Sequence, residues 1–266
     1  MRDLIRLALQ EDIGAGDITT EACIPHSRQA RGRFLAREPL VVAGLDLLPE
    51  IYERSVTLLK ADGDRCTDGD ILAMIEGPAR LLLTRERIAL NFLQRLSGVA
   101  TLARKFADAV AGTRCRVLDT RKTTPGFRVL EKAAAVAGGV TNHRMGLYDA
   151  ILIKNNHISA AGGVRAAIDG VRAVSSLPIE IEVRSSAELR EALDARAAHL
   201  LLDNLTPAEA AEWIREIDGR AKVELSGGIT LETARAYAEA GADYVSSGAI
   251  THSARAMDIS FRLELA

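Results

Sequence analysis

The sequence of 266 residues is poor in cysteine and in aromatic residues, and it has no long apolar run. Its three cysteines, Cys23, Cys66 and Cys115, form no CxxC pair and have no histidine at metal-ligand spacing. We therefore expect buried, reduced thiols in place of a disulfide framework or a structural zinc site. No segment approaches the roughly 20 apolar residues that cross a bilayer, so no membrane contact is expected.

The scarcity of aromatic residues and of net charge also narrows the possible partners. Aromatic residues make up 4% of the chain, the formal net charge is −2 and the pI is near 6.2. Nucleic-acid binding calls for a basic surface with stacking platforms, so a nucleic acid is not an expected partner. The opening stretch MRDLIRLALQED lacks the uninterrupted apolar core of a signal peptide, and we expect a cytoplasmic protein.

The composition that remains, 48% hydrophobic and 26% charged, is that of a globular protein with one large or two modest domains. Residues 2–11 place apolar side chains at helical period, which predicts a short opening helix. Short alternating runs over 33–76, broken at the turns ADGD and TDGD, predict a small antiparallel β region. Residues 81–110 predict a helix, a break near Ser97-Gly98 and a second helix.

Two arginines, Arg85 and Arg87, fall in the first turn of that predicted helix. The helix dipole disfavours a cation there by a few tenths of a kcal/mol or more. Two interpretations stay open: an arginine placed for another use, or an exposed arginine whose cost is screened and offset by Glu86.

From residue 113 onward the apolar pattern alternates between strands and helices. The capping pairs Ser185 with Glu188 and Thr206 with Glu209 begin two of the helices, and Gly241 ends a helix over 230–240. The spacing of the strands is typical of βα units and predicts a parallel β/α barrel, complete or incomplete. The expected strands are 116–118, 150–153, 179–183, 199–202, 222–225 and 243–246.

The stretch DTRKTTPGFR, from Asp119 to Arg128, follows the first of these strands. It carries Arg121 and Lys122 at the carboxyl end of the strand, and residues 116–157 hold seven basic against three acidic residues, an excess of four. A basic turn in solvent would explain a lone Arg-Lys pair. The wider excess, in a chain of net charge −2, favours an anionic small substrate.

Every expected barrel strand ends in polar residues, which is where a β/α barrel places its chemistry. SGG and SGA follow the last two strands, and such turns expose backbone N–H groups that hold phosphate. Glu182 and Asp203 suit ribose hydroxyls or, with Mg²⁺, a diphosphate; Glu180 is the alternative to Glu182. The residues at the six ends are Arg121-Lys122, Lys154, Glu182, Asp203-Asn204, Ser226-Gly227-Gly228 and Ser247-Gly248, with His252 shortly after.

These segments together resemble the quinolinate phosphoribosyltransferase family of NAD biosynthesis over nearly the whole chain. The resemblance implies an N-terminal α/β domain, expected over 1–112 with the tail 260–266 packed back on it. It also implies an incomplete barrel, expected over 113–259, and a homodimer with shared sites, with higher assembly left open. The stretches that carry it are EDIGAGDITT, ERIALNFLQRLSGVAT, DTRKTTPGFR, GGVTNHRMGLYDAILIK, LLDN, ELSGGIT and SGAITHSARAMDIS.

The resemblance also implies roles for single residues in joining quinolinate to phosphoribosyl pyrophosphate. Lys122 would lie near both substrates, and Glu182 and Asp203 would take the ribose and Mg²⁺, directly or through water; these three residues and Lys154 are the implied catalytic groups. The residues implied for the two carboxylates of quinolinate are Arg121, His143, Arg144, Lys154 and, donated across the dimer, Arg87. Those implied for the 5′-phosphate are Ser226, Gly227, Gly228, Gly248 and His252, with Ser247 beside them.

Two positions depart from the family's pattern, and two other functions remain open. Asn155 stands where the family usually has Asp, and Arg184 where an acidic residue is common; we place Arg184 just beyond the site. Nicotinate-type phosphoribosyltransferases share the barrel, although a monocarboxylate needs fewer cations. A homologue associated with molybdate transport has similar domains and would bind an anion without this reaction.

Overall fold

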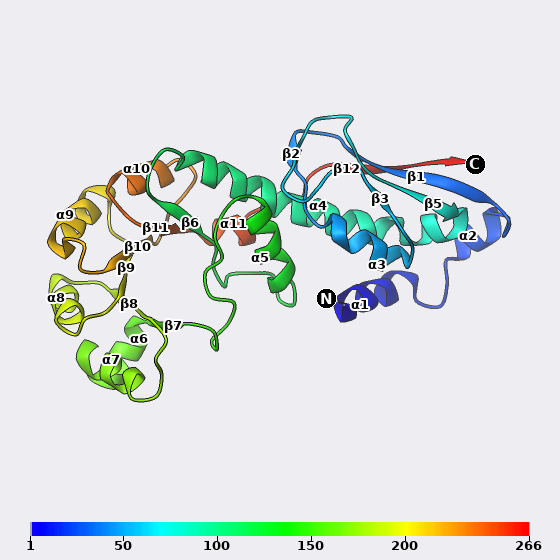
Figure 1. Ribbon diagram of the computed structural model, residues 1–266. Coiled ribbons are helices and arrows are strands. Elements are labelled where there is room, and N and C mark those ends of the chain that lie inside the picture. Colours follow the sequence, from blue (N-terminus) through cyan, green and yellow to red (C-terminus); the bar gives the residue numbers. More distant parts are fainter. Residues whose placement is uncertain (1, 266) are drawn as a thin grey trace. The chain divides into compact units, whose positions relative to one another are not determined.

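The computed structural model describes residues 2–265 and divides into two compact units (Figure 1). Unit 1 holds the residues up to Arg104, Thr123–Gly139 and the residues from Ile250 on. Unit 2 holds Lys105–Lys122 and Val140–Ala249. The domain boundary that we expected between residues 112 and 113 stays a prediction.

Unit 1 contains the predicted opening helix and antiparallel β region. Its four-stranded sheet has the order β12-β1-β5-β3, and β2 pairs with β4 in a separate ribbon. The two predicted turns close as expected, because Asp64 and Asp70 each accept the backbone N–H three residues back, at 2.8 Å. The strands are β1 (Gln29–Ala36), β2 (Leu40–Val41), β3 (Thr57–Leu58), β4 (Arg65–Cys66), β5 (Ile71–Pro78) and β12 (Ile259–Leu265). The helices are α1 (Arg2–Ile13), α2 (Ile18–Cys23), the 3₁₀ turn η1 (Leu45–Leu47), α3 (Leu48–Tyr52) and α5 (Arg128–Ala137).

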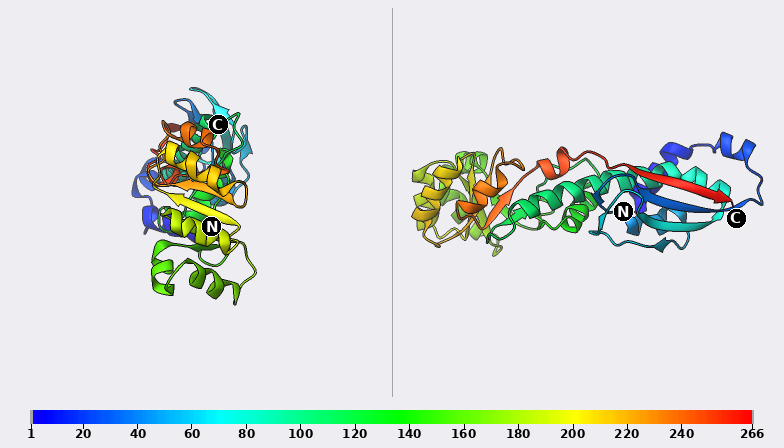
Figure 2. Two further views of the ribbon diagram at one scale, coloured as in Figure 1. Left: turned by 90° about the vertical axis from the view of Figure 1, so that its left-hand side faces the viewer. Right: turned by 90° about the horizontal axis from the view of Figure 1, so that it is seen from above.

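The edge strand β12 comes from the other end of the chain and lies along β1, as the red and blue strands of Figure 2 show. The pairing is antiparallel and runs from Ala30 opposite Leu265 to Ala36 opposite Ile259. Phe34 is fully buried and its ring lies 4.9 Å from that of Phe261, so apolar packing accompanies the backbone pairing. The expected tail 260–266 thus forms most of β12, with Ala266 outside the described residues.

A single helix, α4 (Ala79–Ala109), replaces the helix, break and helix predicted from Ser97-Gly98. That prediction was wrong because Gly98 serves a distant contact: a methyl group there would overlap the carbonyl oxygen of Arg255. The dipole argument was wrong as well, since Arg85 and Arg87 lie in the second and third turns. Arg85 donates to the Ile51 carbonyl at 2.6 Å, whereas Arg87 is exposed.

Unit 2 is built on a parallel sheet of order β6-β11-β10-β9-β8-β7, so all six predicted strands are confirmed. The incomplete β/α barrel is confirmed in that β6 and β7 form the two edges of an open sheet. Helices α8, α9 and α10 lie along one side of it (Figure 1). The strands are β6 (Arg116–Leu118), β7 (Ile151–Ile153), β8 (Ile179–Val183), β9 (His199–Asp203), β10 (Lys222–Ser226) and β11 (Tyr244–Ser246). The helices are α6 (Asn155–Ala161), α7 (Val164–Arg172), α8 (Ser186–Asp194), α9 (Pro207–Ile217) and α10 (Ala234–Glu239); α11 (Ala249–His252) follows β11.

The helix ends follow the predicted caps, with one boundary displaced. Ser185 and Thr206 accept the N–H groups of Glu188 and Glu209 as expected. Helix α10 begins at Ala234 instead of Thr230, because Thr230 and Thr233 form a turn of their own. Gly241 follows it with a φ of 104°, a left-handed conformation that glycine adopts without strain.

The structure also tests the predictions about the cysteines and about membrane-spanning segments. All three cysteines are free, and Cys66 and Cys115 are buried, but Cys23 is exposed at the end of α2, so the expectation of burial was wrong for it. Among the described residues, no helix has both the length and the apolar character needed to span a membrane.

The close approach at Gly98 generates a stability prediction. Gly98→Ala should lower the free energy of unfolding by about 1–3 kcal/mol, because the new methyl group forces α4 away from Arg255. The matched control is Gly170→Ala on α7, where nothing lies within 4 Å of the added Cβ and alanine favours the helix. Thermal unfolding of both variants checks this; an unchanged midpoint for Gly98→Ala would contradict it.

Candidate active site

Most residues predicted for the site lie in unit 2, at or just after the carboxyl ends of the parallel strands, whereas Arg87 and His252 belong to unit 1. Directly after β6, Asp119 is fully buried and its Oδ1 accepts the backbone N–H of His143 at 2.8 Å. Leu118 also forms a parallel bridge with Thr141. These contacts bring the start of the DTRK stretch and the NHR stretch together, although more than 20 residues separate them.

The charges of two predicted quinolinate ligands, Arg121 and Arg144, act on one another. The pKa of Arg144 is lowered, first by burial and then by the charge of Arg121, against the opposing charges of Glu180 and Asp149. The Arg144 side chain donates to the Ala150 carbonyl at 3.3 Å. Like charges are costly to hold together, so this arrangement suits a site that an anion completes.

Two lysines, Lys122 and Lys154, complete the basic part of the predicted site, and the neutral Asn155 follows the second of them. Lys122 is exposed after Arg121, and its backbone N–H donates to Thr120 at 3.0 Å. Lys154 is exposed just ahead of α6, and its backbone N–H donates to His157 Nδ1 at 2.9 Å. Asn155 is the first residue of α6. The exposed ammonium groups are accessible to a ligand in solution.

The ring of His143 has protein partners on both nitrogens. Its Nδ1 accepts the backbone N–H of Arg144 at 2.7 Å, which places the proton on Nε2. Nε2 lies 3.1 Å from Glu180 Oε2 and 3.5 Å from Glu224 Oε2. The imidazole therefore links the backbone of Arg144 to the two buried carboxyl groups.

Glu180 and Glu224 form a buried acid pair beneath His143. Burial and the charge of Glu180 raise the pKa of Glu224 well above its usual value. Burial also acts on Glu180, but the hydrogen bond and the charges of His143 and His199 outweigh it and lower the pKa of that carboxyl. The opposite directions of the two pKa shifts favour one proton on the pair, carried by Glu224.

This acid pair bears on the choice between Glu180 and Glu182 and on metal binding. Sequence reasoning kept Glu180 as an alternative and missed Glu224, which the period of two along β10 could have shown facing inward with Glu180. Ligand atoms of His143, Glu180 and Glu224 lie within 4.8 Å of one another, so a divalent cation could replace the shared proton there. Glu182 and Asp203 are a second, separate pair of oxygen donors.

Arg184 reaches both members of that second pair. Its Nη2 lies 2.7 Å from Glu182 Oε1 and 3.3 Å from Asp203 Oδ2. Placing Arg184 just beyond the site was therefore wrong: the residue follows β8, but its side chain turns back to the carboxylates. Asp203 Oδ2 also accepts from Asn204 Nδ2 at 2.7 Å.

The predicted phosphate residues form tight turns after β10 and β11. Gly227 and Gly228 have φ values of 93° and 62°, and a methyl group on Gly227 would overlap the side chain of Asn204, so glycine is required there. Ser247 is buried, and its Oγ donates to the Ile229 carbonyl at 2.8 Å, which ties the two turns together. Ser226 ends β10, Gly248 is buried, and His252 is exposed at the end of α11 with its Nδ1 2.7 Å from Ser253 Oγ.

Within unit 1, a buried ion pair anchors the second half of the DTRKTTPGFR stretch. Glu131 is fully buried, and its Oε1 accepts hydrogen bonds from Arg95 Nε and Nη2 at 3.1 and 2.7 Å. The same carboxylate accepts the Thr124 backbone N–H at 2.9 Å and its hydroxyl at 2.8 Å. Arg95 further donates to the carbonyls of Thr251 and Ala254. Sequence reasoning did not single out this pair.

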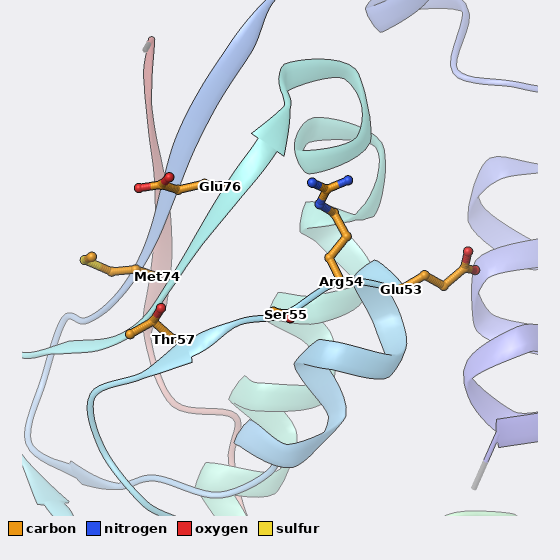
Figure 3. Close-up of a pocket in the computed structure, with 6 residues that line it drawn as sticks. All are labelled: Glu53, Arg54, Ser55, Thr57, Met74 and Glu76. Atoms are coloured by element: carbon orange, nitrogen blue, oxygen red, sulfur yellow. The ribbon is translucent and has the colours of Figure 1, made fainter.

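Unit 1 also has a surface hollow of about 440 Å³ near the end of α3 (Figure 3). Its lining comes from the segment after α3 and from strands β3 and β5, and none of the predicted site residues belongs to it. The lining residues are Glu53, Arg54, Ser55, Thr57, Met74 and Glu76.

Comparison with known proteins gives similarity over both parts of the chain. The family model "Quinolinate phosphoribosyl transferase, N-terminal domain" matches residues 17–97, and the corresponding C-terminal domain model matches 99–262. A nicotinate-nucleotide pyrophosphorylase (carboxylating) from Mycobacterium leprae is 42% identical, with 98% of this chain and 96% of that protein covered. A quinolinate phosphoribosyltransferase (decarboxylating) from Nicotiana glauca is 39% identical, covering 99% and 82%. The crystal structure of NadC from Streptococcus pyogenes superimposes with a TM-score of 0.94 at 40% identity, covering 99% and 96%.

The raised pKa of Glu224 predicts how stability varies with pH. A carboxyl group with a raised pKa in the folded state takes up a proton on folding, so the free energy of unfolding falls as pH rises from about 4.5 through the raised pKa. Glu224→Gln keeps the shape and an N–H donor but removes this uptake. As pH rises, the free energy of unfolding of the variant should therefore increase relative to that of the wild type, by up to about 1.4 kcal/mol per pH unit.

Urea unfolding from about pH 5 to about pH 8 measures this gain. Glu212→Gln, an exposed change on α9, is the control and should follow the wild type at every pH. Parallel profiles for Glu224→Gln and the wild type would show that Glu224 does not carry the proton.

Proposed function

The chain belongs to the quinolinate phosphoribosyltransferase family, and from this premise we propose how its residues perform the family's reaction. The enzyme is a carboxylating nicotinate-nucleotide pyrophosphorylase. It joins quinolinate to phosphoribosyl pyrophosphate and releases pyrophosphate and CO₂. The product, nicotinate mononucleotide, is an intermediate of NAD biosynthesis.

Arg121 and Arg144 would receive the two carboxylates of quinolinate, together with Lys154. The observation that carries this assignment is the lowered pKa of Arg144, which burial causes first and the charge of Arg121 second. A dianion relieves the repulsion between the two charges, whereas water does so poorly. His143 would act on quinolinate chiefly through Arg144, because its Nδ1 holds the Arg144 backbone and its Nε2 faces buried acids.

Phosphoribosyl pyrophosphate would lie across the turns after β9, β10 and β11. The backbone N–H groups of Ser226, Gly227, Gly228 and Gly248 would bind its 5′-phosphate, and Ser247 would fix the turns. His252, which the family resemblance assigns to the same phosphate, stays part of the proposal. Lys122 would reach the diphosphate.

Glu182 and Asp203 would hold Mg²⁺ and the ribose. Both are oxygen donors of the kind that Mg²⁺ prefers, and the pair already attracts a cation, Arg184, which supports the assignment. Mg²⁺ would supply charge for the departing diphosphate, directly or through water.

The chemistry needs charge stabilisation more than proton transfer. Loss of pyrophosphate at the anomeric carbon gives that carbon oxocarbenium character, which the carboxylates of Glu182 and Asp203 favour. The pyridine nitrogen of quinolinate carries its own lone pair and attacks without a general base. Loss of the 2-carboxylate as CO₂ leaves its bonding electron pair on ring carbon 2, which takes up one proton from solvent. The product keeps a positively charged ring nitrogen, now bonded to the ribose.

We further propose a cytoplasmic homodimer in which each site receives Arg87 from the partner. The exposure of Arg87, in contrast to Arg85 in the same helix, supports this. The dimer symmetry would place each copy of α4 opposite the other subunit's barrel. A higher assembly of dimers is compatible with the same site.

The cation cluster predicts strong discrimination between acids. Nicotinate lacks one carboxylate and would leave a cation unpaired, so its kcat/KM should be roughly 10⁴-fold lower than that of quinolinate. Steady-state assays with each acid, phosphoribosyl pyrophosphate and Mg²⁺ measure the ratio. Comparable values would favour a nicotinate-type enzyme, and no turnover of either acid would favour an anion-binding homologue such as the molybdate-associated one.

The shared site predicts complementation between two inactive variants. Arg87→Ala and Lys154→Ala should each lose about 2–5 kcal/mol of transition-state stabilisation. Refolded together, about half of the dimers are mixed, and each mixed dimer has one intact site, which gives roughly a quarter of wild-type activity. Tagged subunits verify the mixing; a verified mixture without activity would mean that Arg87 does not complete the neighbouring site.

A further inference from the structure

One guanidinium nitrogen of Arg184 stands where the proposed function puts a divalent cation. Arg184 Nη2 contacts Glu182 Oε1 at 2.7 Å and Asp203 Oδ2 at 3.3 Å. The Glu182 and Asp203 side chains are 7% and 16% exposed, so neither carboxylate is well solvated by bulk water. Two shielded negative charges on neighbouring strands favour a cation between them.

The backbone of Arg184 is fixed, while its side chain has room to move. Its N–H donates to Glu188 Oε2 at 2.7 Å in the first turn of α8, beside the cap formed by Ser185. The side chain is 48% exposed, so it can leave the carboxylates for solvent without unfolding anything. Because the two carboxylates are shielded from water, they would be costly to leave unpaired, so Arg184 leaves them when another cation takes its place.

We propose that Arg184 competes with the divalent cation for Glu182 and Asp203 and is displaced when the metal binds with phosphoribosyl pyrophosphate. This inference rests on the proposed role of Glu182 and Asp203 as metal ligands. In the free enzyme the guanidinium neutralises the pair. On binding, the metal takes its place and Arg184 turns towards solvent.

The competition has a thermodynamic consequence. Metal affinity is reduced by the fraction of molecules in which Arg184 occupies the pair, as for any ligand that must displace a competing state. The enzyme would therefore bind the metal weakly alone and better with the diphosphate, whose own oxygens add ligands. Removing the guanidinium should tighten metal binding without touching a metal ligand.

Mn²⁺ serves as the probe, because its electron paramagnetic resonance signal reports free ion directly. Titrations use the full-length enzyme with phosphoribosyl pyrophosphate and without quinolinate, so that no turnover occurs. Arg184→Gln should bind Mn²⁺ about tenfold more tightly than the wild type, since a competing and repelling charge is lost. The matched control is Arg190→Gln, an exposed arginine on α8 paired with Glu216 at 2.7 Å, which should bind like the wild type.

A third variant separates this inference from the proposed metal site. Asp203→Asn should weaken Mn²⁺ binding, and adding it to Arg184→Gln should abolish the gain. If Asp203→Asn weakens binding while Arg184→Gln leaves it unchanged, the competition is overturned and the metal site stands. If neither variant changes Mn²⁺ binding, both the competition and the proposed metal site are overturned. Circular dichroism of each variant confirms that it is folded.

Discussion

The ion pair between Arg95 and Glu131 is the constraint on which the arrangement of unit 1 depends. A fully buried carboxylate is tolerable only when paired and hydrogen-bonded, and Glu131 meets this with Arg95 and both polar groups of Thr124. The remaining donors of Arg95 bind the carbonyls of Thr251 and Ala254. One charge pair thus joins α4, α5, the TTPG turn and the segment at α11, so loops far apart in sequence share one anchor.

The parallel sheet and its polar edge were predictable from the sequence because both depend on local pattern. Strands of branched apolar residues end in polar ones, and parallel strands bring those ends to one edge. Contacts between distant segments were not predictable. Gly98 was taken for a helix break, but glycine is needed there because the backbone of Arg255 packs against it. The side chain of Arg184 turns back to Glu182, in a direction that residue spacing does not encode.

The interior of the parallel sheet carries charge-bearing groups where a barrel usually packs branched apolar side chains. Asp119, Glu180 and Glu224 are all buried, and His143 contacts each of them through its ring or backbone. Such a network is rigid only when every member is satisfied. The network matters for Arg144, because the His143 ring accepts its backbone N–H.

The pairing of β12 with β1 has a consequence for synthesis on the ribosome. Residues 37–258 must all be added after β1 before its partner strand exists, which takes roughly 10 to 45 s at ordinary elongation rates. During that interval β1 presents one row of unpaired backbone groups, the kind of edge that invites pairing with other chains. The nascent chain therefore carries this open sheet edge from the synthesis of β1 until residues 259–265 have been added.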